Sequence, residues 1–511
     1  MGSEIELKLA IDPIDISRLR HSLSSMVTKR RHNRPRRFVS TYFDTKSLSL
    51  AQNGVSLRVR KIGRRRIQTI KLAAADGGDL MTRSEWETPT QRDRPDLKLV
   101  DDPALRRLIG KCRRKERLDA MFVTDVRRET WLLLLDGSEV KCALDRGQIA
   151  APKRKMPICE VELELKAGPR APLFKLARKL NKSAPLHVET RSKAARGCDL
   201  VTGTAPLPPS ANFPVLDPAM DTRSAFGSIA RACTANILAC ASYARQNTDP
   251  EGIHQLRIAI RRLRAASSIF RQGTKERRSG IASNSRTLRL DLGAARDWDV
   301  LIEIEGTMPK RLRGQKGFSE MMKTAGEERT KESKRARAAL EDPRCTDLLL
   351  ELTSWIDRRF GLMIDQSQPP EDVACRKVGD FAAQLLKERQ RKVRKLAKKV
   401  DKLDPQELHE LRIRIKKLRY VVELFQDLWR GAGVEKYLSK LKQLQDSLGI
   451  AHDVLVSSHL IRNLEAHKKR SDKNIGTLVS EWAATSFDRE KKKTIHLLRK
   501  MPRFEPLAPK R

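Results

Sequence analysis

The chain has 511 residues, a length that points to more than one domain, and 39% of them are hydrophobic, which is enough to build real cores. Its formal net charge of +41, from 105 Lys and Arg against 64 Asp and Glu, calls for a polyanionic partner, because a compact chain of this charge repels itself. Nucleic acid, an anionic membrane surface and polyphosphate are the candidate partners.

Cysteine usage and the N-terminal sequence argue against secretion and against membrane insertion. The eight cysteines form no CxxC pair and no regular framework, which fits a reducing cytosol. The stretch MGSEIELKLA is acidic from the start, unlike a signal peptide, and the sequence has no run of about twenty apolar residues to span a membrane. We therefore expect a cytoplasmic protein without a membrane span.

A stretch rich in proline and small residues, TGTAPLPPSANFPVLDP, begins at Thr202 and is typical of a linker. Apolar and polar residues alternate before it, as in strands, and follow helical spacing after it. We predict an α+β protein with a β-rich domain over residues 1–201, a linker over 202–219, an all-helical domain over 220–500 and a tail over 501–511.

Several of the expected strands carry charges along one face. In EIELKLA, alternation places Glu4, Glu6 and Lys8 together. A solvated outer face of an ordinary sheet explains any one such strand. It explains less well why carboxylates gather in the first and last strands and guanidinium groups in the middle ones. Carboxylate oxygens suit Mg²⁺, and Arg and Lys suit phosphate oxygens, so a polar lumen holding a metal–polyphosphate complex is a plausible alternative.

The stretches EIELK, STYFDT, SLRVR, TIKL, RSEWE, RRETW, CALDRG, ICEVELEL and SKAARG occur in the order typical of the CYTH family, the triphosphate tunnel metalloenzymes, which this part of the chain resembles. The resemblance implies an antiparallel barrel of eight strands, with flanking helices, that forms a tunnel. It also implies hydrolysis or conversion of triphosphate compounds with Mg²⁺ or Mn²⁺. The likeness is closest to bacterial inorganic triphosphatases with a helical partner domain.

The resemblance implies a role for each matching residue. The expected metal-binding carboxylates are Glu4, Glu6, Asp145, Glu160, Glu162 and Glu164, and which of the last three coordinate is left open. The expected triphosphate-binding and catalytic residues are Lys8, Arg58, Arg60, Lys71, Arg83, Glu85, Arg128 and Lys193. Positioning and charge neutralisation would supply most of the rate acceleration when water attacks the terminal phosphorus.

The expected helical domain contains one pattern twice: HQLRIAIRRLR from His254 and HELRIRIKKLR from His409. Basic residues three, seven and ten positions after each histidine lie on one side of a helix. The stretches LGAARDWDV and LGIAHDVLV follow in the same order, which predicts an internal duplication with copies around 220–365 and 370–500. A solvated charged face is the simpler interpretation of each stripe, but it predicts interspersed acids, which the stripes lack.

These stripes resemble the CHAD family, the conserved-histidine α-helical domains. The resemblance implies a pair of related helical bundles with a basic, histidine-bearing surface for inorganic polyphosphate, and an association with polyphosphate granules. The expected polyphosphate-binding residues are His254, Arg257, Arg261, Arg262, Arg264, Arg296, His409, Arg412, Lys416, Lys417, Arg419 and His452. Zinc binding is disfavoured, because HExxH is absent and no cysteine joins the pattern.

Together these features predict a metal-dependent inorganic triphosphatase, a hydrolase of phosphoanhydride bonds, joined to a polyphosphate-binding domain. Another tunnel activity, either a class IV-type adenylate cyclase or a thiamine triphosphatase, is an alternative, because tunnel residues are shared across those activities. A non-catalytic protein that binds polyphosphate or nucleic acid is a second alternative. Nucleic acid is not favoured, since aromatic residues make up only 5% of the chain and offer few stacking platforms.

Overall fold

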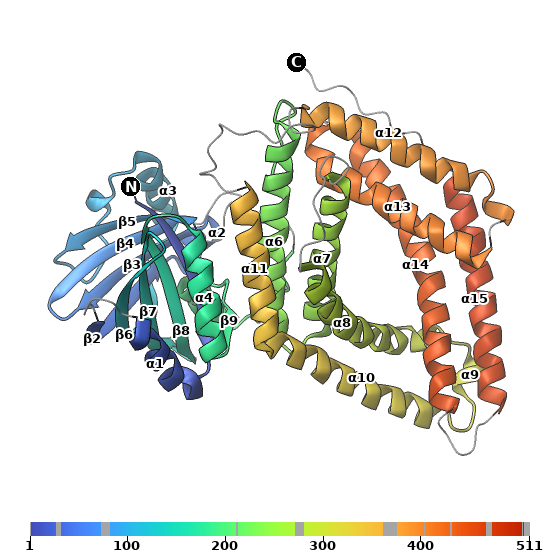
Figure 1. Cartoon of the computed structure of the whole chain (residues 1–511), viewed down its shortest axis with the longest axis horizontal. Helices are drawn as coiled ribbons and strands as arrows, with labels where there is room; N and C mark the ends of the chain where they lie inside the picture. The colour runs from blue at the N-terminus through green and yellow to red at the C-terminus, as the bar shows by residue number, and fades with distance from the viewer. Residues whose placement is uncertain are drawn as a thin grey trace. The chain divides into compact units, whose positions relative to one another are not determined.

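The computed structural model describes residues 2–26, 32–72, 82–210, 213–270, 281–360, 376–402, 404–429, 432–466, 473–502 and 504. The chain divides into two compact units (Figure 1). Unit 1 comprises Met1–Asn212, Thr234–Gln246 and Glu341–Gly361, and unit 2 comprises Phe213–Cys233, Asn247–Leu340 and Leu362–Arg511. The α+β fold class is confirmed: unit 1 contains the sheet, and unit 2 is helical.

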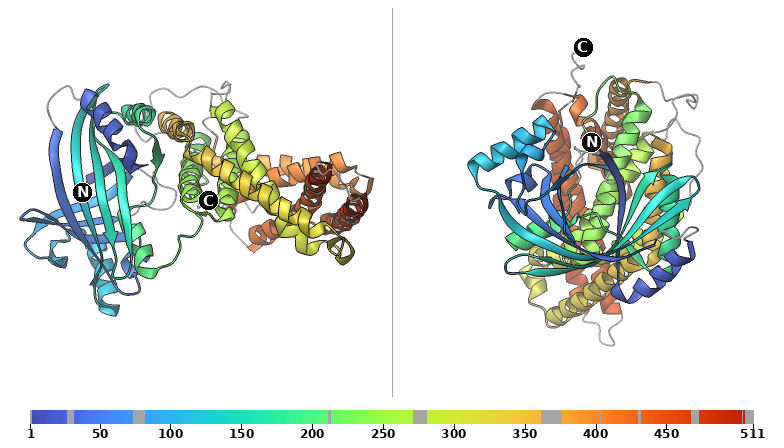
Figure 2. Two further views of the ribbon diagram at one scale, coloured as in Figure 1. Left: turned by 90° about the horizontal axis from the view of Figure 1, so that it is seen from below. Right: turned by 90° about the vertical axis from the view of Figure 1, so that its left-hand side faces the viewer.

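Unit 1 is built on one antiparallel sheet, whose curvature is visible in Figure 2. The strands are β1 (Gly2–Ile11), β2 (His32–Asp44), β3 (Val55–Ile62), β4 (Arg65–Leu72), β5 (Thr82–Thr90), β6 (Asp119–Leu135), β7 (Ser138–Ala150), β8 (Lys155–Ala167) and β9 (Leu186–Val188). Their order is β5-β4-β3-β2-β6-β7-β8-β1-β9. An additional pairing of Gly2–Ile5 with Thr82–Glu85 links β1 to β5.

The prediction of eight strands is one too few, because the described residues form a nine-stranded sheet. The additional strand is β9, which pairs with Leu9, Ala10 and Ile11 of β1. With only three residues, β9 is too short to show an alternating pattern of its own. The apolar face of the longer strands is buried, as at Leu7 and Leu9 of β1 and Leu163 of β8, but Lys8 and Glu160 on the polar face are buried as well.

Short helices accompany the sheet: α1 (Ile16–Met26), α2 (Ser49–Gln52), α3 (Pro103–Lys115), α4 (Ala171–Ser183) and α5 (Lys193–Thr202). One apolar cluster joins Leu57 of β3 and Ile70 of β4 to Ile109 of α3. The side chain of Ser192 begins α5 by accepting a hydrogen bond from the Ala195 amide at 3.0 Å. That cap stabilises the first turn of α5, which begins with Lys193.

Two segments distant in sequence complete unit 1: α11 (Pro343–Phe360) and the C-terminal half of α6 (Thr222–Gln246). Helix α11 packs against α4 (Figure 1). The Asn181 amide on α4 donates to the Pro343 carbonyl at 2.8 Å and to Asp347 at 3.0 Å. The Thr346 hydroxyl donates to the backbone oxygen of Leu186 in β9 at 2.6 Å. Helix α11 is therefore hydrogen-bonded to the sheet as well as packed beside it.

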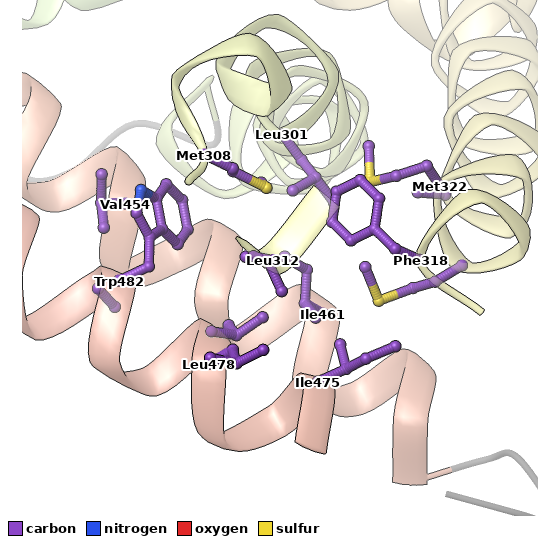
Figure 3. Packing of buried hydrophobic residues seen from close by; sticks show 14 residues of the cluster. Leu301, Met308, Leu312, Phe318, Met322, Val454, Ile461, Ile475, Leu478 and Trp482 are labelled. Carbon is purple, nitrogen blue, oxygen red and sulfur yellow. The ribbon is translucent and has the colours of Figure 1, made fainter. Parts of the chain in front are cut away.

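The remaining helices are α7 (Pro250–Phe270), α8 (Ile281–Ile304), α9 (Lys310–Arg313), α10 (Phe318–Glu341), α12 (Val378–Ala397), α13 (Pro405–Phe425), α14 (Ala432–Ala466) and α15 (Lys473–Arg499). Asp404 and Glu407 form a capping box at the start of α13. A core of unit 2 joins Leu301 of α8 and Phe318 of α10 to Ile461 of α14 and Trp482 of α15 (Figure 3). Within the described residues, none of the helices is both long and apolar enough to cross a membrane.

Candidate functional site

Three carboxylates from two neighbouring strands lie together in unit 1. Asp145 of β7 is paired in register with Glu160 of β8, and Glu162 lies two residues further along the same face. One oxygen from each of the three groups lies within 4.8 Å of the others. Asp145 and Glu160 are almost completely buried, at 0% and 1% exposure. A hard divalent cation takes oxygen ligands of this kind, so this carboxylate cluster (Asp145, Glu160 and Glu162) fits Mg²⁺ or a similar ion.

Two cationic side chains contact the carboxylate cluster. Arg128 of β6 pairs in register with Asp145 and donates to it from Nε and Nη2, both at 2.6 Å. Arg128 also pairs with Glu162. Lys193, at the start of α5, lies 2.6 Å from Asp145 and 2.7 Å from Glu162, and also contacts Glu160. Both residues were predicted for the site, and the structure brings them to the three acids.

A third cation, Arg196, was missed by sequence reasoning. It lies one helical turn after Lys193 on α5, is 8% exposed and forms an ion pair with Glu160. Its signal was present in the stretch SKAARG, where the spacing of three residues places the lysine and the arginine on one side of a helix. Helix α5 therefore contributes two cations to the carboxylate cluster.

These neighbours keep the acids ionised in spite of their burial. Burial alone would raise the pKa of Asp145, but Arg128 and Lys193 outweigh it and hold that pKa below its ordinary value. The pKa of Glu162 is held well below its ordinary range against the effect of burial, chiefly by Lys193 and Arg128. Lys193 and Arg196 lower the pKa of Glu160 in the same way. The three acids thus remain ionised, and Arg128, Lys193 and Arg196 balance their charge, so a bound metal ion would take the place of some of these cationic contacts.

A second group of predicted residues lies on β3, β4 and β5. Glu85 forms an ion pair on each of two sides, with Arg58 at 3.7 Å and with Lys71 at 3.3 Å. Arg60 lies 3.9 Å from Glu87. Burial and the charges of Arg58 and Arg128 lower the pKa of Arg60 to about 10. A cation held close to other cations, with few acids to balance it, gains most from a bound polyanion.

Two aromatic residues of β2 that the sequence reasoning did not include contact these cations. The Tyr42 hydroxyl accepts a hydrogen bond from Arg58 at 3.1 Å. Burial would raise the pKa of Tyr42, but the charge of Arg58 lowers it below its ordinary value. The Phe38 ring lies 5.7 Å from the Arg60 guanidinium carbon and 5.6 Å from that of Arg128. Phe38 therefore stands between predicted phosphate-binding arginines of two different strands.

The other predicted residues of the tunnel are placed as follows. Lys8 is buried and its ammonium lies 3.8 Å from Glu6 on the same face of β1. Glu164, on the same face of β8 as Glu160 and Glu162, pairs with Lys141 at 2.9 Å and with Lys166. Glu4 and Arg83 occupy paired positions on β1 and β5, but their side chains lie outside the described residues.

The doubled pattern in the helical sequence lies on α7 and α13, and each partner motif lies on the following helix, α8 or α14. Helix α7 contacts α8 and α13, and α14 contacts α13 and α8. The rings of His409 and His452 lie 5.7 Å apart between centroids. Arg257 donates to the backbone oxygens of Leu292 and Gly293 at 3.0 and 2.9 Å. We call the predicted residues on these four helices the ladder residues.

The ladder residues on α7 and those on α13 and α14 are close enough to influence each other's protonation. Burial, with the charges of Arg261 on α7 and Arg412 on α13, lowers the pKa of Lys416 to about 8. Burial and the charge of Arg412, with His409 and Lys416, lower the pKa of His452 to about 4. The Nε atoms of Arg261 and Arg412 are buried and have no hydrogen-bond partner among the residues that the structure describes. This clustering of like charges is unfavourable by itself and would be relieved by an anion.

The remaining ladder residues differ in their surroundings. Arg296 forms a two-point pair with Glu303, and Arg419 donates to Glu423 at 2.6 Å. Arg262 lies over the Phe213 ring at 5.5 Å. Arg264 and Lys417 are exposed, and His254 is half-buried with its pKa lowered by burial and by Arg296. The structure thus places the residues on four contacting helices, and some of the basic groups already have acidic partners.

Comparison with known proteins assigns both parts of the chain. The family model of the CYTH domain matches residues 2–198, and that of the CHAD domain matches residues 228–462. The inorganic triphosphatase of Haemophilus influenzae is 30% identical over 202 residues, which cover 39% of this chain and 54% of that protein. The chain therefore matches about half the length of this relative.

A solved structure supports the second assignment. The crystal structure of the CHAD domain from the plant Ricinus communis is similar with a TM-score of 0.51 and 25% sequence identity, over 59% of this chain and 99% of that one. The chain therefore belongs among the proteins that carry a CYTH domain followed by a CHAD domain.

Proposed function

We propose that the protein is a metal-dependent inorganic triphosphatase whose reaction takes place at the carboxylate cluster. The observation that carries the proposal is the contact of Asp145, Glu160 and Glu162 with Arg128 and Lys193, in the same sheet as Arg58, Arg60 and Lys71. The relative named as an inorganic triphosphatase supports this choice of reaction over the other tunnel activities.

The chemistry divides between the acids and the bases. Asp145, Glu160 and Glu162 would hold Mg²⁺ or Mn²⁺, which when bound supplies positive charge to the triphosphate oxygens and acidifies water. Arg58, Arg60 and Lys71 would bind the phosphate oxygens and orient the triphosphate for in-line attack by water. Burial keeps bulk water from screening these charges, so their attraction for the charge that develops in the transition state is stronger than at an open surface.

Phosphate release from inorganic triphosphate, ATP, thiamine triphosphate and long-chain polyphosphate, with Mg²⁺, Mn²⁺ or EDTA, tests this proposal. We expect fast release from inorganic triphosphate, abolished by EDTA and by the Glu162→Gln variant. Release from thiamine triphosphate alone, or formation of cyclic AMP from ATP, would contradict the assignment. The Glu6→Gln variant examines the contribution of β1 in the same assay.

We propose inorganic polyphosphate as the ligand of the ladder residues. Like charges lie together on α7 and α13, and the buried Nε atoms of Arg261 and Arg412 have no hydrogen-bond partner in the described part of the chain. Both features favour a long anion that repeats along its length. A cytoplasmic location and association with polyphosphate granules belong to the same proposal. Calorimetric titration with long-chain polyphosphate, and separately with double-stranded DNA of equal charge, tests it. Tighter binding of DNA would overturn the choice of ligand.

A further inference from the structure

Glu189, a buried acid outside the carboxylate cluster, is hydrogen-bonded to the C-terminal half of α6. Glu189 is 6% exposed and lies in the short segment between β9 and α5. Its backbone amide donates to the Lys8 carbonyl of β1 at 2.9 Å. Neither the predicted triphosphate-binding set nor the predicted metal-binding set contains it, yet it is one of the least exposed carboxylates of unit 1.

The Glu189 carboxylate is held mainly from α6. Its Oε2 accepts a hydrogen bond from the Gln246 amide at 3.0 Å, and its Oε1 accepts from the Ser242 hydroxyl at 3.4 Å. Gln246 also donates to Ser242 at 3.2 Å, so the two α6 side chains support each other. The Arg191 backbone amide donates to Oε1 at 2.8 Å. Burying a carboxylate is costly, and these donors are what offset the cost.

The same acid is electrostatically coupled to Arg196. Burial lowers the pKa of Arg196, but the charges of Glu160 and Glu189 raise it above its ordinary value. Arg196 is therefore paired with Glu160 of the carboxylate cluster and is also attracted by Glu189, the acid held by α6. Lys193, one turn earlier on α5, reaches the same cluster. Both cations of α5 thus depend on how the segment that begins at Glu189 is placed.

We infer that Glu189, held by Gln246 and Ser242, is a positioning residue that fixes the start of α5 and so keeps Lys193 and Arg196 on the carboxylate cluster. The inference rests on the proposed triphosphatase function for its kinetic consequence, but not for its structural one. Residues 234–246 lie in the stretch that matches the CHAD family, although they belong to the compact unit of the sheet. The stretch that matches the CHAD family therefore contributes to the geometry around the carboxylate cluster.

Amide hydrogen exchange of the full-length protein measures this positioning directly. In Gln246→Leu, which keeps the side-chain volume and removes the amide, we expect faster exchange over residues 193–202. Ser242→Ala, a milder change, should show a smaller increase in the same residues. Gln52→Leu is the matched control, because Gln52 is exposed on α2 and its side-chain amide donates to the Ser47 carbonyl. Unchanged exchange over 193–202 in Gln246→Leu would overturn the inference.

Kinetics separate positioning from general destabilisation. We expect kcat/KM for inorganic triphosphate to fall roughly tenfold in Gln246→Leu, since small displacements of binding groups are costly. If Gln246 acts through Glu189, the double variant Glu189→Gln/Gln246→Leu should lose no more than Glu189→Gln alone. Additive losses would contradict the inference. An inactive wild-type protein that shows the expected exchange pattern would refute the triphosphatase proposal while supporting the positioning role.

Discussion

Arg128 and Asp145 form a two-point ion pair across neighbouring strands, with Nε–Oδ1 and Nη2–Oδ2 distances of 2.6 Å. Asp145 is fully buried, so this pair is shielded from water on the side of the carboxylate. A planar guanidinium matches a carboxylate in a way that a single ammonium does not. The pair therefore fixes the direction of the Asp145 oxygens as well as their charge.

Arg128→Lys should consequently impair turnover although it keeps the charge. We expect kcat/KM for inorganic triphosphate to fall about ten- to a hundredfold, the range for losing a hydrogen bond between charged groups. Arg37→Lys is the matched control, since Arg37 makes the same two-point contact with Asp125, at 2.8 and 2.6 Å, on the exposed surface. Equal losses in the two variants would show that the geometry of the buried pair does not matter.

The lowered pKa values of the carboxylate cluster predict a loss of stability in acid. A carboxyl whose pKa is lowered in the folded state stabilises the protein above its unfolded pKa, and this stabilisation is lost as the pH falls through the folded value. For Glu162 the decline begins near the ordinary value of 4.5 and continues below it. Between pH 6 and pH 3 the urea midpoint of Glu162→Gln should therefore fall less than that of the wild type.

Asp136→Asn is the control for acid stability, because Asp136 pairs with Lys175 at 2.8 Å but is exposed. Screening by solvent makes such a pair worth little, so its removal should leave the pH dependence almost as in the wild type. If Glu162→Gln and the wild type lose stability in parallel, the ionised Glu162 does not stabilise the folded state.

Lys416 should make the affinity for polyphosphate fall as the pH rises above neutrality. Its pKa is lowered to about 8, so it is charged below that pH and loses its proton above it. We expect affinity for polyphosphate to weaken between pH 7 and pH 9 in the wild type. In Lys416→Arg, whose side chain stays charged over this range, the dependence should become flatter. Calorimetry at constant ionic strength measures both, and identical profiles would exclude Lys416 from the binding surface.

Charge reversal of ladder residues should weaken polyphosphate binding without affecting the triphosphatase reaction. Changing Arg257, Arg261, Arg412 and Lys416 to Glu is expected to weaken polyphosphate binding strongly and to reduce its salt dependence, because fewer counterions are released. Phosphate release from inorganic triphosphate should be unchanged. Reversal of four exposed residues on or just after α12, Arg391, Lys395, Lys398 and Lys399, controls for the total charge. An equal effect from this control would mean that binding responds to net charge alone.

Sequence reasoning succeeded where one strand or one helix carries the signal. Alternation placed Glu160 and Glu162 on one strand face, and helical spacing placed Arg257 and Arg261 on one helix, as the structure has them. It failed where a role depends on contacts between distant segments. Glu189 accepts hydrogen bonds from Ser242 and Gln246, which lie more than fifty positions away on α6. No pattern in the sequence around Glu189 indicates these contacts.

The same limit explains the missed residues of the sheet. Phe38 in β2 is an ordinary strand residue until β3 and β6 bring Arg60 and Arg128 to its ring. Strand β9 has only three residues, and it exists because β1 offers it hydrogen-bonding partners. Pairing between strands is a property of the folded chain, so a short strand and a ring between two cations cannot be found from their own neighbours in sequence.

The division of α6 between the two compact units bears on how such a protein can evolve. Thr234–Gln246 and α11 are encoded far downstream of the sheet, yet Asn181, Leu186 and Glu189 use them as hydrogen-bond partners. Recombination at the proline-rich stretch after Thr202 would join the sheet to a different downstream sequence that lacks those partners. Residues 1–201 by themselves would therefore leave Asn181, Leu186 and Glu189 without these hydrogen-bond partners.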